Sequence, residues 1–448
     1  MAKVTLPNKR LKLPGGDRSK GSECCALART NYRSMSPRPR ASRPQLERDP
    51  LGGGRVPSPR CASLVQALGA SALRLSFTRE RFWNVRSAAA LLFLSLLPSA
   101  VPPQASLSST DDPSPPVVDL VFHFETARRL IGLFDRSTIS DEDLEGVLRF
   151  EDVRAIIRQA ARFDSRATDQ EFKRSLRAAV EGRELRDDLF QFQTVRARLA
   201  AIRTLLRRLQ DSTQSLSRQV SDRIRAYSPR ELNLQAEVHF VLGGSSDGWV
   251  PQPRSFYVAL QYFEGDYEGL TLIMAHELFH VAQSEFMVEA ASSGESRAVI
   301  NAKNLLQQTI GEGTASMVGD PLRVSGGGSY VAWFRGKFER NLARIESNVA
   351  LFDVLLYRLY HDPDADYQAV YKLGFSGTWD SPLYFVGYRI GRMIEKYDGR
   401  DALTDLLQRP PTAFFLRYIA LYRSHQDPDL VRFSKETEEI LEALHQPH

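Results

Sequence analysis

The spacing of hydrophobic residues separates a helical region from a region that begins with strands. From about residue 118 to 232, hydrophobic residues recur every three to four positions, which is typical of amphipathic helices. Ser140 followed by three acidic residues is typical of a helix start. The spacing predicts a short strand at 119–124, a helix from Ser140, and further helices over 127–134, 151–163, 169–181, 186–208 and 211–226.

Beyond residue 235 the hydrophobic period changes to two. Residues 236–242 alternate between polar and hydrophobic side chains, and residues 255–263 alternate again after a glycine-rich stretch, so both segments are predicted strands. Helical spacing returns later, over about 330–360 and 401–445. This order of elements predicts an α+β protein that is mainly α-helical, with a small β-sheet.

One predicted helix, around residues 271–283, is hydrophobic on nearly every face and contains His276-Glu-Leu-Phe-His280. Residues four apart share a helix face, so His276 and His280 could bind one Zn²⁺, with Glu277 beside it to polarise a water. Such a helix is buried, and two imidazoles and a carboxylate are costly there unless a metal or a hydrogen-bond network satisfies them. The alternative is a buried helix with two hydrogen-bonded histidines.

The third metal ligand defines the subclass of such a site. The metzincin pattern needs a glycine and a histidine where Gln283 and Phe286 stand. We expect Glu312 to be the ligand, at the start of a small-residue helix and between two glycines that permit close backbone approach. The alternative for Glu312 is a carboxylate favoured by a helix N-terminus. The other downstream acidic candidates are Glu285, Glu289 and Glu295.

A further predicted helix begins at Pro382, a residue well suited to a first helical turn. Tyr384 and Tyr388 share one face of it, and Gly387 and Gly391 share another, which permits tight helix packing. A tyrosine hydroxyl facing the metal could stabilise the oxyanion formed during attack on a carbonyl. The alternative is that both tyrosines belong to the core.

Charge and cysteine content differ between the first 86 residues and the remainder. The 448-residue chain has a net charge of +5, but residues 1–86 carry a net +13 and the rest a net −8. The acidic remainder gives no reason to expect a nucleic acid as partner. Cys24, Cys25 and Cys61 all precede residue 87, so the remainder has neither disulfides nor cysteine metal ligands.

The first part of the chain has the composition of a leader. Residues 1–80 are rich in Arg, Pro, Ser and Gly and are predicted to be disordered. Residues 81–105 combine basic residues, a hydrophobic run of about a dozen residues and a small-residue end, which is typical of a secretory signal peptide. A signal peptide stands at the N-terminus of its chain, whereas this one begins near residue 81. We therefore expect translation to begin at Val85 if its codon is GTG, which would leave the basic leader untranslated. The expected location is periplasmic or secreted.

The remaining residues form a linker and one domain. Residues 106–117 are rich in Ser, Asp and Pro and are predicted to be a linker. We expect one domain over 118–448, with a helical part at 118–235 and a catalytic part at 236–448. No cysteine lies near the small-residue end of the predicted signal peptide, where cleavage is expected, so no lipid anchor to a membrane is predicted. The sequence does not fix an oligomeric state.

Several of these motifs together resemble a bacterial family of zinc-dependent peptidases of the gluzincin type. The matching segments, within residues 118–430, are Ser246-Asp-Gly248-Trp, His276-Glu-Leu-Phe-His280 followed by Gln283, Gly311-Glu-Gly-Thr-Ala-Ser316, and Pro382-Leu-Tyr-Phe-Val-Gly-Tyr388. The resemblance implies a zincin-like core, the ligands His276, His280 and Glu312, and Glu277 as general base.

The function expected from the sequence is hydrolysis of peptide bonds by a zinc-activated water, with a peptide or protein as substrate. A different metal-dependent amide or ester hydrolase is one alternative. Another is a helical binding protein in which zinc is structural, so that removing the metal would unfold the chain.

Overall fold

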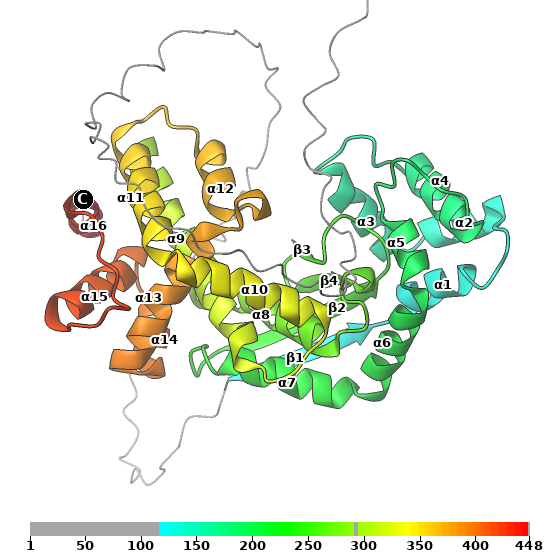
Figure 1. Ribbon diagram of the computed structural model, residues 1–448, viewed down its shortest axis with the longest axis horizontal. Helices are drawn as coiled ribbons and strands as arrows, with labels where there is room; N and C mark the ends of the chain where they lie inside the picture. Colours follow the sequence, from blue (N-terminus) through cyan, green and yellow to red (C-terminus); the bar gives the residue numbers. More distant parts are fainter. Residues whose placement is uncertain (1–115, 291–293, 447–448) are drawn as a thin grey trace, which may run out of the picture. The chain divides into compact units, whose positions relative to one another are not determined.

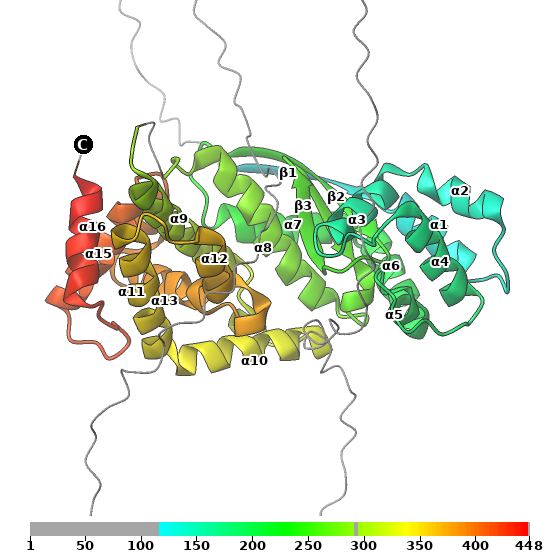
Figure 2. The same ribbon diagram turned by 90° about the horizontal axis from the view of Figure 1, so that it is seen from above.

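A computed structural model describes residues 116–290 and 294–446. The predicted disordered leader (1–80), the predicted signal peptide (81–105) and nearly all of the predicted linker (106–117) lie outside these residues. The described chain is mostly helical with one four-stranded sheet, which confirms the α+β prediction. Figure 1 shows the sheet and helix α8 between an N-terminal group of helices (α1–α6) and a C-terminal group (α9 and α11–α16), and Figure 2 shows the same order.

The sheet has the strand order β1-β2-β4-β3. Strands β1, β2 and β4 run parallel to one another, and β3 pairs antiparallel with β4 at one edge. The strands are β1 (Val117–His123), β2 (Asn233–Val241), β3 (Gly248–Gln252) and β4 (Ser255–Ala259). Three parallel strands with one antiparallel edge strand are therefore the frame that positions the helices described below.

The helices divide into those before and those after β2. The first group is α1 (Glu125–Leu133), α2 (Asp141–Leu148), α3 (Glu151–Ala161), α4 (Asp169–Val180), α5 (Phe192–Ala197), α6 (Leu199–Asp211) and α7 (Thr213–Arg225). The second group is α8 (Tyr267–Phe286), α9 (Arg297–Val318), α10 (Ser329–Ala343), α11 (Ile345–His361), α12 (Tyr367–Phe375), α13 (Pro382–Asp398), α14 (Arg400–Leu407), α15 (Pro411–Ser424) and α16 (Lys435–His445).

The two faces of the sheet have different neighbours. Residues alternate along β2, so that Leu234, Ala236, Val238 and Phe240 are buried on one face. This face packs against α8, since a side chain added at Gly248 of β3 would contact Ile273 of α8. The opposite face carries Glu237 and is partly covered by α3, which brings Asp152 against β2. Helix α8, which contains His276 and His280, therefore lies on the hydrophobic face of the sheet.

Several predicted elements end earlier than the hydrophobic spacing suggests. The predicted strand 255–263 is wrong beyond Ala259, where a 3₁₀ turn (Leu260–Tyr262) follows, and Arg198 of the helical region donates a hydrogen bond to the Gln261 carbonyl there at 2.8 Å. The predicted helices 186–208 and 330–360 are each two helices, because the backbone leaves helical geometry at Arg198 and at Arg344. Sequence spacing does not register such one-residue interruptions.

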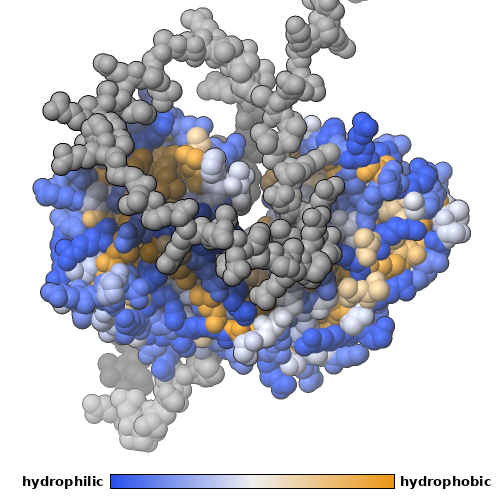
Figure 3. Space-filling model, in the orientation of Figure 1, coloured by the Kyte–Doolittle hydropathy of each residue, from blue (hydrophilic) through white to orange (hydrophobic). Residues whose placement is uncertain are grey.

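The surface gives no indication of a membrane-spanning helix. Among the residues that the structure describes, no helix is both long enough and apolar enough to cross a bilayer. Figure 3 shows one face of the molecule, on which hydrophilic residues predominate and hydrophobic residues form smaller patches.

Candidate metal centre

Helix α8 is buried along most of its length and is fixed at its start. Asp266 precedes the helix, and its carboxylate accepts hydrogen bonds from the backbone N–H groups of Gly269 (3.0 Å), Gly328 (2.8 Å) and Val331 (2.9 Å). The last two belong to the start of α10, so one buried carboxylate joins the beginnings of two helices. Asp266 thereby fixes the N-terminal end of α8, which precedes His276, Glu277 and His280 in the helix.

His276 and His280 of α8 meet Glu312 of α9 at a single point. The Nε2 atoms of the two histidines are 3.3 Å apart, and Glu312 Oε2 lies 3.6 Å from His276 Nε2 and 3.3 Å from His280 Nε2. The side chains of His276 and Glu312 are 8% and 9% exposed, and that of His280 is 26% exposed. Three potential metal ligands therefore converge at a largely buried position with one more open side.

The spacing of these three atoms fits a zinc ion. Zinc binds nitrogen and oxygen ligands at about 2.0–2.2 Å in tetrahedral geometry, which places neighbouring ligand atoms about 3.3–3.5 Å apart. The three observed separations of 3.3, 3.3 and 3.6 Å agree with that figure. Glu312 Oε2 is also buried without a hydrogen bond, so the oxygen that points at the two histidines has a free lone pair. The residues present thus match a three-ligand zinc site with a fourth position left for water or substrate.

The electrostatics of the three ligands favour a cation between them. Burial acts to raise the pKa of Glu312, but His280 and His276 outweigh it and hold this pKa well below the usual range. Burial acts to lower the pKa of His280, but Glu312 raises it to about 9. Each group therefore stabilises an ionised partner, and a metal cation at this point would replace the positive charge of the histidine proton.

Glu312 lies deep inside a helix and not at its start. Helix α9 begins at Arg297, so the prediction that Glu312 opens a helical stretch is wrong, and so is the alternative of a helix N-terminal carboxylate. The residues before Glu312, expected to be a polar loop, form the first part of α9, and their polar side chains lie mostly on the less buried side of that helix. The carboxylate instead reaches α8 because α9 packs directly against it.

The remaining predicted residues fall in different surroundings. Glu277 is half-buried next to the ligands, and burial raises its pKa against the opposing effect of His276 and His280. The Tyr384 ring stacks on the His276 ring at 6.2 Å between centroids, with 8° between the planes. Tyr388, one turn later, instead donates its hydroxyl hydrogen to Asp320 Oδ2 at 2.8 Å. The structure therefore brings Glu277 and Tyr384 to the ligands and pairs Tyr388 with another carboxylate.

The other acidic candidates for the third ligand have different partners. Glu285 binds Arg254 at 2.9 Å, and Glu295 binds Lys303. Glu289 lines a pocket of about 470 Å³ that opens beside His280 and is bordered also by Gln308. None of the three joins the group formed by His276, His280 and Glu312 among the described residues.

Gln283 connects a ligand histidine to the helix that carries Glu312. Its Oε1 lies 2.8 Å from His280 Nδ1, and its Nε2 donates to the Gly311 carbonyl at 3.0 Å and to Thr314 Oγ1 at 2.8 Å. An amide oxygen accepts, so His280 carries a proton on Nδ1 and directs Nε2 toward the ligand position, where a bound metal would replace the second proton. Gln283 is therefore a positioning residue, placed where the metzincin pattern would have glycine.

We expect Gln283→Ala to weaken zinc binding by about 10–100-fold, the usual effect of removing a group that orients a metal-ligating histidine. Zinc affinity, measured by competition with a chromogenic chelator, tests this expectation. Gln307→Ala is the matched control, because Gln307 is a neighbouring glutamine on α9 with no hydrogen bond to a ligand. Equal affinities of the Gln283→Ala and Gln307→Ala variants would contradict the role of Gln283.

Three further residues near the ligands received no role from the sequence, although Asp247 stands within the Ser246-Asp-Gly248-Trp segment. Lys337 of α10 is 5.6 Å from the centre of the Tyr384 ring, and burial lowers its pKa. Tyr371 of α12 lies close enough to Glu312 and Glu277 for their charges, added to burial, to raise its pKa. Asp247, just before β3, accepts a hydrogen bond from the Tyr330 hydroxyl at 2.5 Å and acts electrostatically on Glu277. Only their position in the fold identifies them.

Comparison with known proteins assigns the chain to a family. No curated protein and no solved structure shows a significant match. Residues 145–427 match the family described as "Putative zinc dependent peptidase (DUF5700)". This segment includes α8, α9 and α13 and thus His276, Glu277, His280, Glu312 and Tyr384. The match spans more than half of the chain and confirms the resemblance found in the sequence, so the chain belongs to this family.

Proposed function

We propose that this protein is a zinc-dependent peptidase of the gluzincin type, with its reaction centre at His276, Glu277, His280 and Glu312. The observation that carries the proposal is the triangle of ligand atoms with edges of 3.3, 3.3 and 3.6 Å, next to a half-buried glutamate. A purely structural zinc site is usually closed by four protein ligands, whereas this site offers three and a more exposed side at His280.

The residues around the ligands have distinct parts in the proposed reaction. Zinc, when bound, lowers the pKa of a water at the site to about 7 and polarises a carbonyl group. Glu277 accepts the proton of that water and donates it to the leaving amine. Tyr384 keeps its proton, because burial and Glu312 raise its pKa well above 10, and its hydroxyl can donate to the carbonyl oxygen as that oxygen becomes negative. Lys337 places a half-buried amino group beside the Tyr384 ring.

The sheet offers a surface for an extended substrate. Strand β3 is an edge strand that pairs with β4 on one side only. Helix α8 contacts β3 at Ile273, one turn before His276. Asp247, the residue before β3, lies close enough to Glu277 to act on it electrostatically. A peptide that adds to this edge as a further strand would lie next to the reaction centre. This arrangement favours a zincin-like core and a peptide or protein substrate.

Export is part of the same proposal. The predicted signal peptide at 81–105 would direct the protein to the periplasm or the exterior, where a peptidase would meet peptide substrates. No nucleic acid and no stable membrane anchor are required for the activity.

Zinc content and peptide hydrolysis together test the proposal. We expect Glu312→Ala to bind one zinc ion fewer per chain than the wild type and to lose hydrolysis of a peptide mixture followed by mass spectrometry. Glu285→Ala is the matched control, since Glu285 is a nearby glutamate that pairs with Arg254, and it should keep both properties. Hydrolysis that persists after complete metal removal would contradict the proposal. Hydrolysis of esters or amides without peptides would instead favour the alternative hydrolase.

A further inference from the structure

A row of four rings crosses the sheet on the face opposite α8. His123 of β1 is in register with His239 of β2, His239 with Tyr257 of β4, and Tyr257 with Trp249 of β3. Successive ring centres are 4.5, 4.4 and 5.4 Å apart, with angles between planes of 15°, 7° and 22°. Strand register alone therefore places two histidines from distant parts of the sequence face to face.

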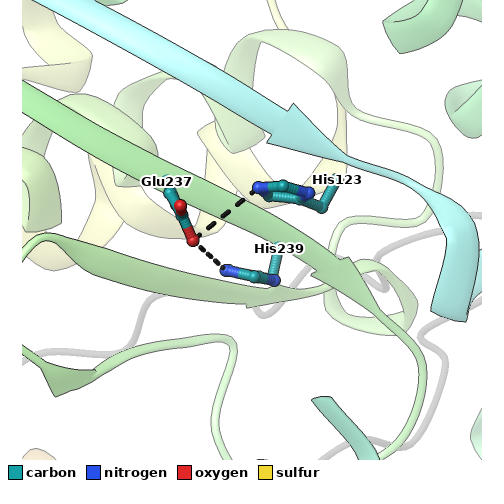
Figure 4. A group of neighbouring side chains, drawn as sticks. All are labelled: His123, Glu237 and His239. Atoms are coloured by element: carbon teal, nitrogen blue, oxygen red, sulfur yellow. Dashed lines mark ion pairs between the residues drawn. The ribbon is translucent and has the colours of Figure 1, made fainter. Parts of the chain in front are cut away.

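A glutamate completes this pair of histidines. Glu237 lies two residues before His239 and thus on the same face of β2. Its Oε2 is 3.4 Å from His239 Nε2 and 3.8 Å from His123 Nε2, and all three ligand atoms lie within 4.8 Å of one another. Figure 4 shows Glu237 facing both imidazoles, that of His239 on its own strand β2 and that of His123 on β1. His123 Nε2 is buried and has no hydrogen-bond partner among the described residues, although its side chain is 41% exposed.

The second nitrogen of His239 faces another carboxylate. Its Nδ1 lies 2.9 Å from Asp152 Oδ1, within ion-pair distance but off the line of a well-formed hydrogen bond. Asp152 Oδ2 in turn accepts a hydrogen bond from Thr126 Oγ1 at 2.6 Å. Burial acts to raise the pKa of Asp152, but His239 and Thr126 outweigh it and lower this pKa, so the carboxylate is ionised. A carboxylate behind one imidazole nitrogen leaves the other free, as is usual for histidines that bind metals.

We propose that His123, Glu237 and His239 bind a second divalent transition-metal ion, with zinc as the expected occupant. Two imidazoles and one carboxylate are a ligand set typical of zinc, and Glu237 is 56% exposed, which leaves room for water as a further ligand. The site shares no ligand with the reaction centre. The ion links β1, an edge strand, to β2 at a register pair and thereby stabilises that strand in the sheet.

This second site is expected to be weaker than the first. The separation of 3.4 Å between His239 and Glu237 fits the spacing of about 3.3–3.5 Å for tetrahedral zinc ligands, but the 3.8 Å between His123 and Glu237 exceeds it, so His123 must turn slightly to complete the site. The partly exposed histidine and glutamate also lose more freedom on binding than buried ligands do. The proposal does not depend on peptidase activity.

Metal titration of the full chain tests the proposal. We expect calorimetric titration with Zn²⁺ to give two equivalents for the wild type and one for His239→Ala, with peptide hydrolysis retained in the variant. Asp152→Asn should keep the second equivalent with an affinity about 10–100-fold weaker. His361→Ala, a histidine on α11 outside both groups, is the matched control and should bind two equivalents.

Two milder variants keep the test decisive if His239→Ala does not fold. His123→Ala and Glu237→Gln alter side chains that are 41% and 56% exposed, and each should lose the same equivalent. Replacement of Zn²⁺ by Co²⁺ in a Glu312→Ala background should give a visible absorption band from the second site alone. A single equivalent in the wild type that Glu312→Ala removes, or two equivalents in all three variants, would overturn the proposal.

Discussion

Replacing Glu277 by glutamine is expected to lower kcat/KM for peptide hydrolysis by about 10²–10⁴-fold, the usual contribution of a general acid–base group. The amide has nearly the shape of the carboxylate but cannot accept the proton of a water. Because Glu277 is next to the ligands and is not one of them, zinc should remain bound at the wild-type level. Steady-state rates on a cleaved peptide, together with zinc content, measure the two effects separately.

The control for this prediction is Glu285→Gln, on the same helix. Glu285 is on the surface and pairs with Arg254, so its variant should keep full activity and full zinc. The thermal midpoint of Glu277→Gln should equal or exceed that of the wild type, since burial already raises the pKa of this carboxyl and the amide carries no charge. A Glu277→Gln enzyme with near wild-type kcat/KM would exclude Glu277 as the base.

The proposed zinc ligands could be predicted from the sequence because their geometry is local or nearly so. His276 and His280 are one helical turn apart, so their common direction follows from helix geometry alone. The glycines on both sides of Glu312 indicate it as the third ligand, although its predicted place at the start of a helix is wrong. Residues 297–308 carry hydrophobic side chains at helical spacing, including Ala302, Leu305 and Leu306, so the first part of α9 could have been predicted as helix.

Residues that reach the centre through tertiary packing could not be predicted. Lys337 is one of several cationic residues of α10, and nothing in its spacing distinguishes the one that packs beside Tyr384. The pairing of His123 with His239 depends on a parallel register between strands more than a hundred residues apart. Periodicity predicts which residues share a face of one strand, but it says nothing about which strand lies next to it.

The sheet illustrates the same limit on the scale of the fold. The alternating segments of β2 and β4 were predicted, and β1 was expected as a short strand. Strand β3 was missed, because it is five residues long and contains Gly248 and Pro251, which disfavour strands in general. Proline is tolerated there because β3 lies at the sheet edge, where one side has no partner strand.

Gly387→Ala is expected to destabilise the protein by about 3 kcal/mol or more, at or above the upper end of the usual cost of overpacking. A methyl group at Gly387 would lie 1.9 Å from the carbonyl oxygen of Thr309 and 3.0 Å from the Cα of Gly313. These are backbone atoms of α9, so no side chain can turn aside, and α9 and α13 would have to separate. Chemical unfolding monitored by circular dichroism measures the loss.

The same substitution in an open position isolates this effect. Gly132 of α1 has no atom within 4 Å of an added methyl group. Gly132→Ala should therefore be neutral or stabilise the protein by up to about 1 kcal/mol through helix propensity. Equal stabilities of Gly387→Ala and Gly132→Ala would show that the contact between α9 and α13 is not tight.

The effect of Gly387→Ala should extend to the metal. Gly313 follows Glu312 directly, and Gly387 lies three residues after Tyr384, so the contact between these glycines sets the distance between a zinc ligand and the tyrosine beside His276. Separating the helices would move Glu312 away from the point where the ligand atoms are 3.3–3.6 Å apart. We therefore expect zinc affinity to fall in Gly387→Ala even under conditions where the variant remains folded, and to be unchanged in Gly132→Ala. Gly313 and Gly387 would then be required for zinc binding, because the close approach of α9 and α13 determines where the Glu312 carboxylate lies.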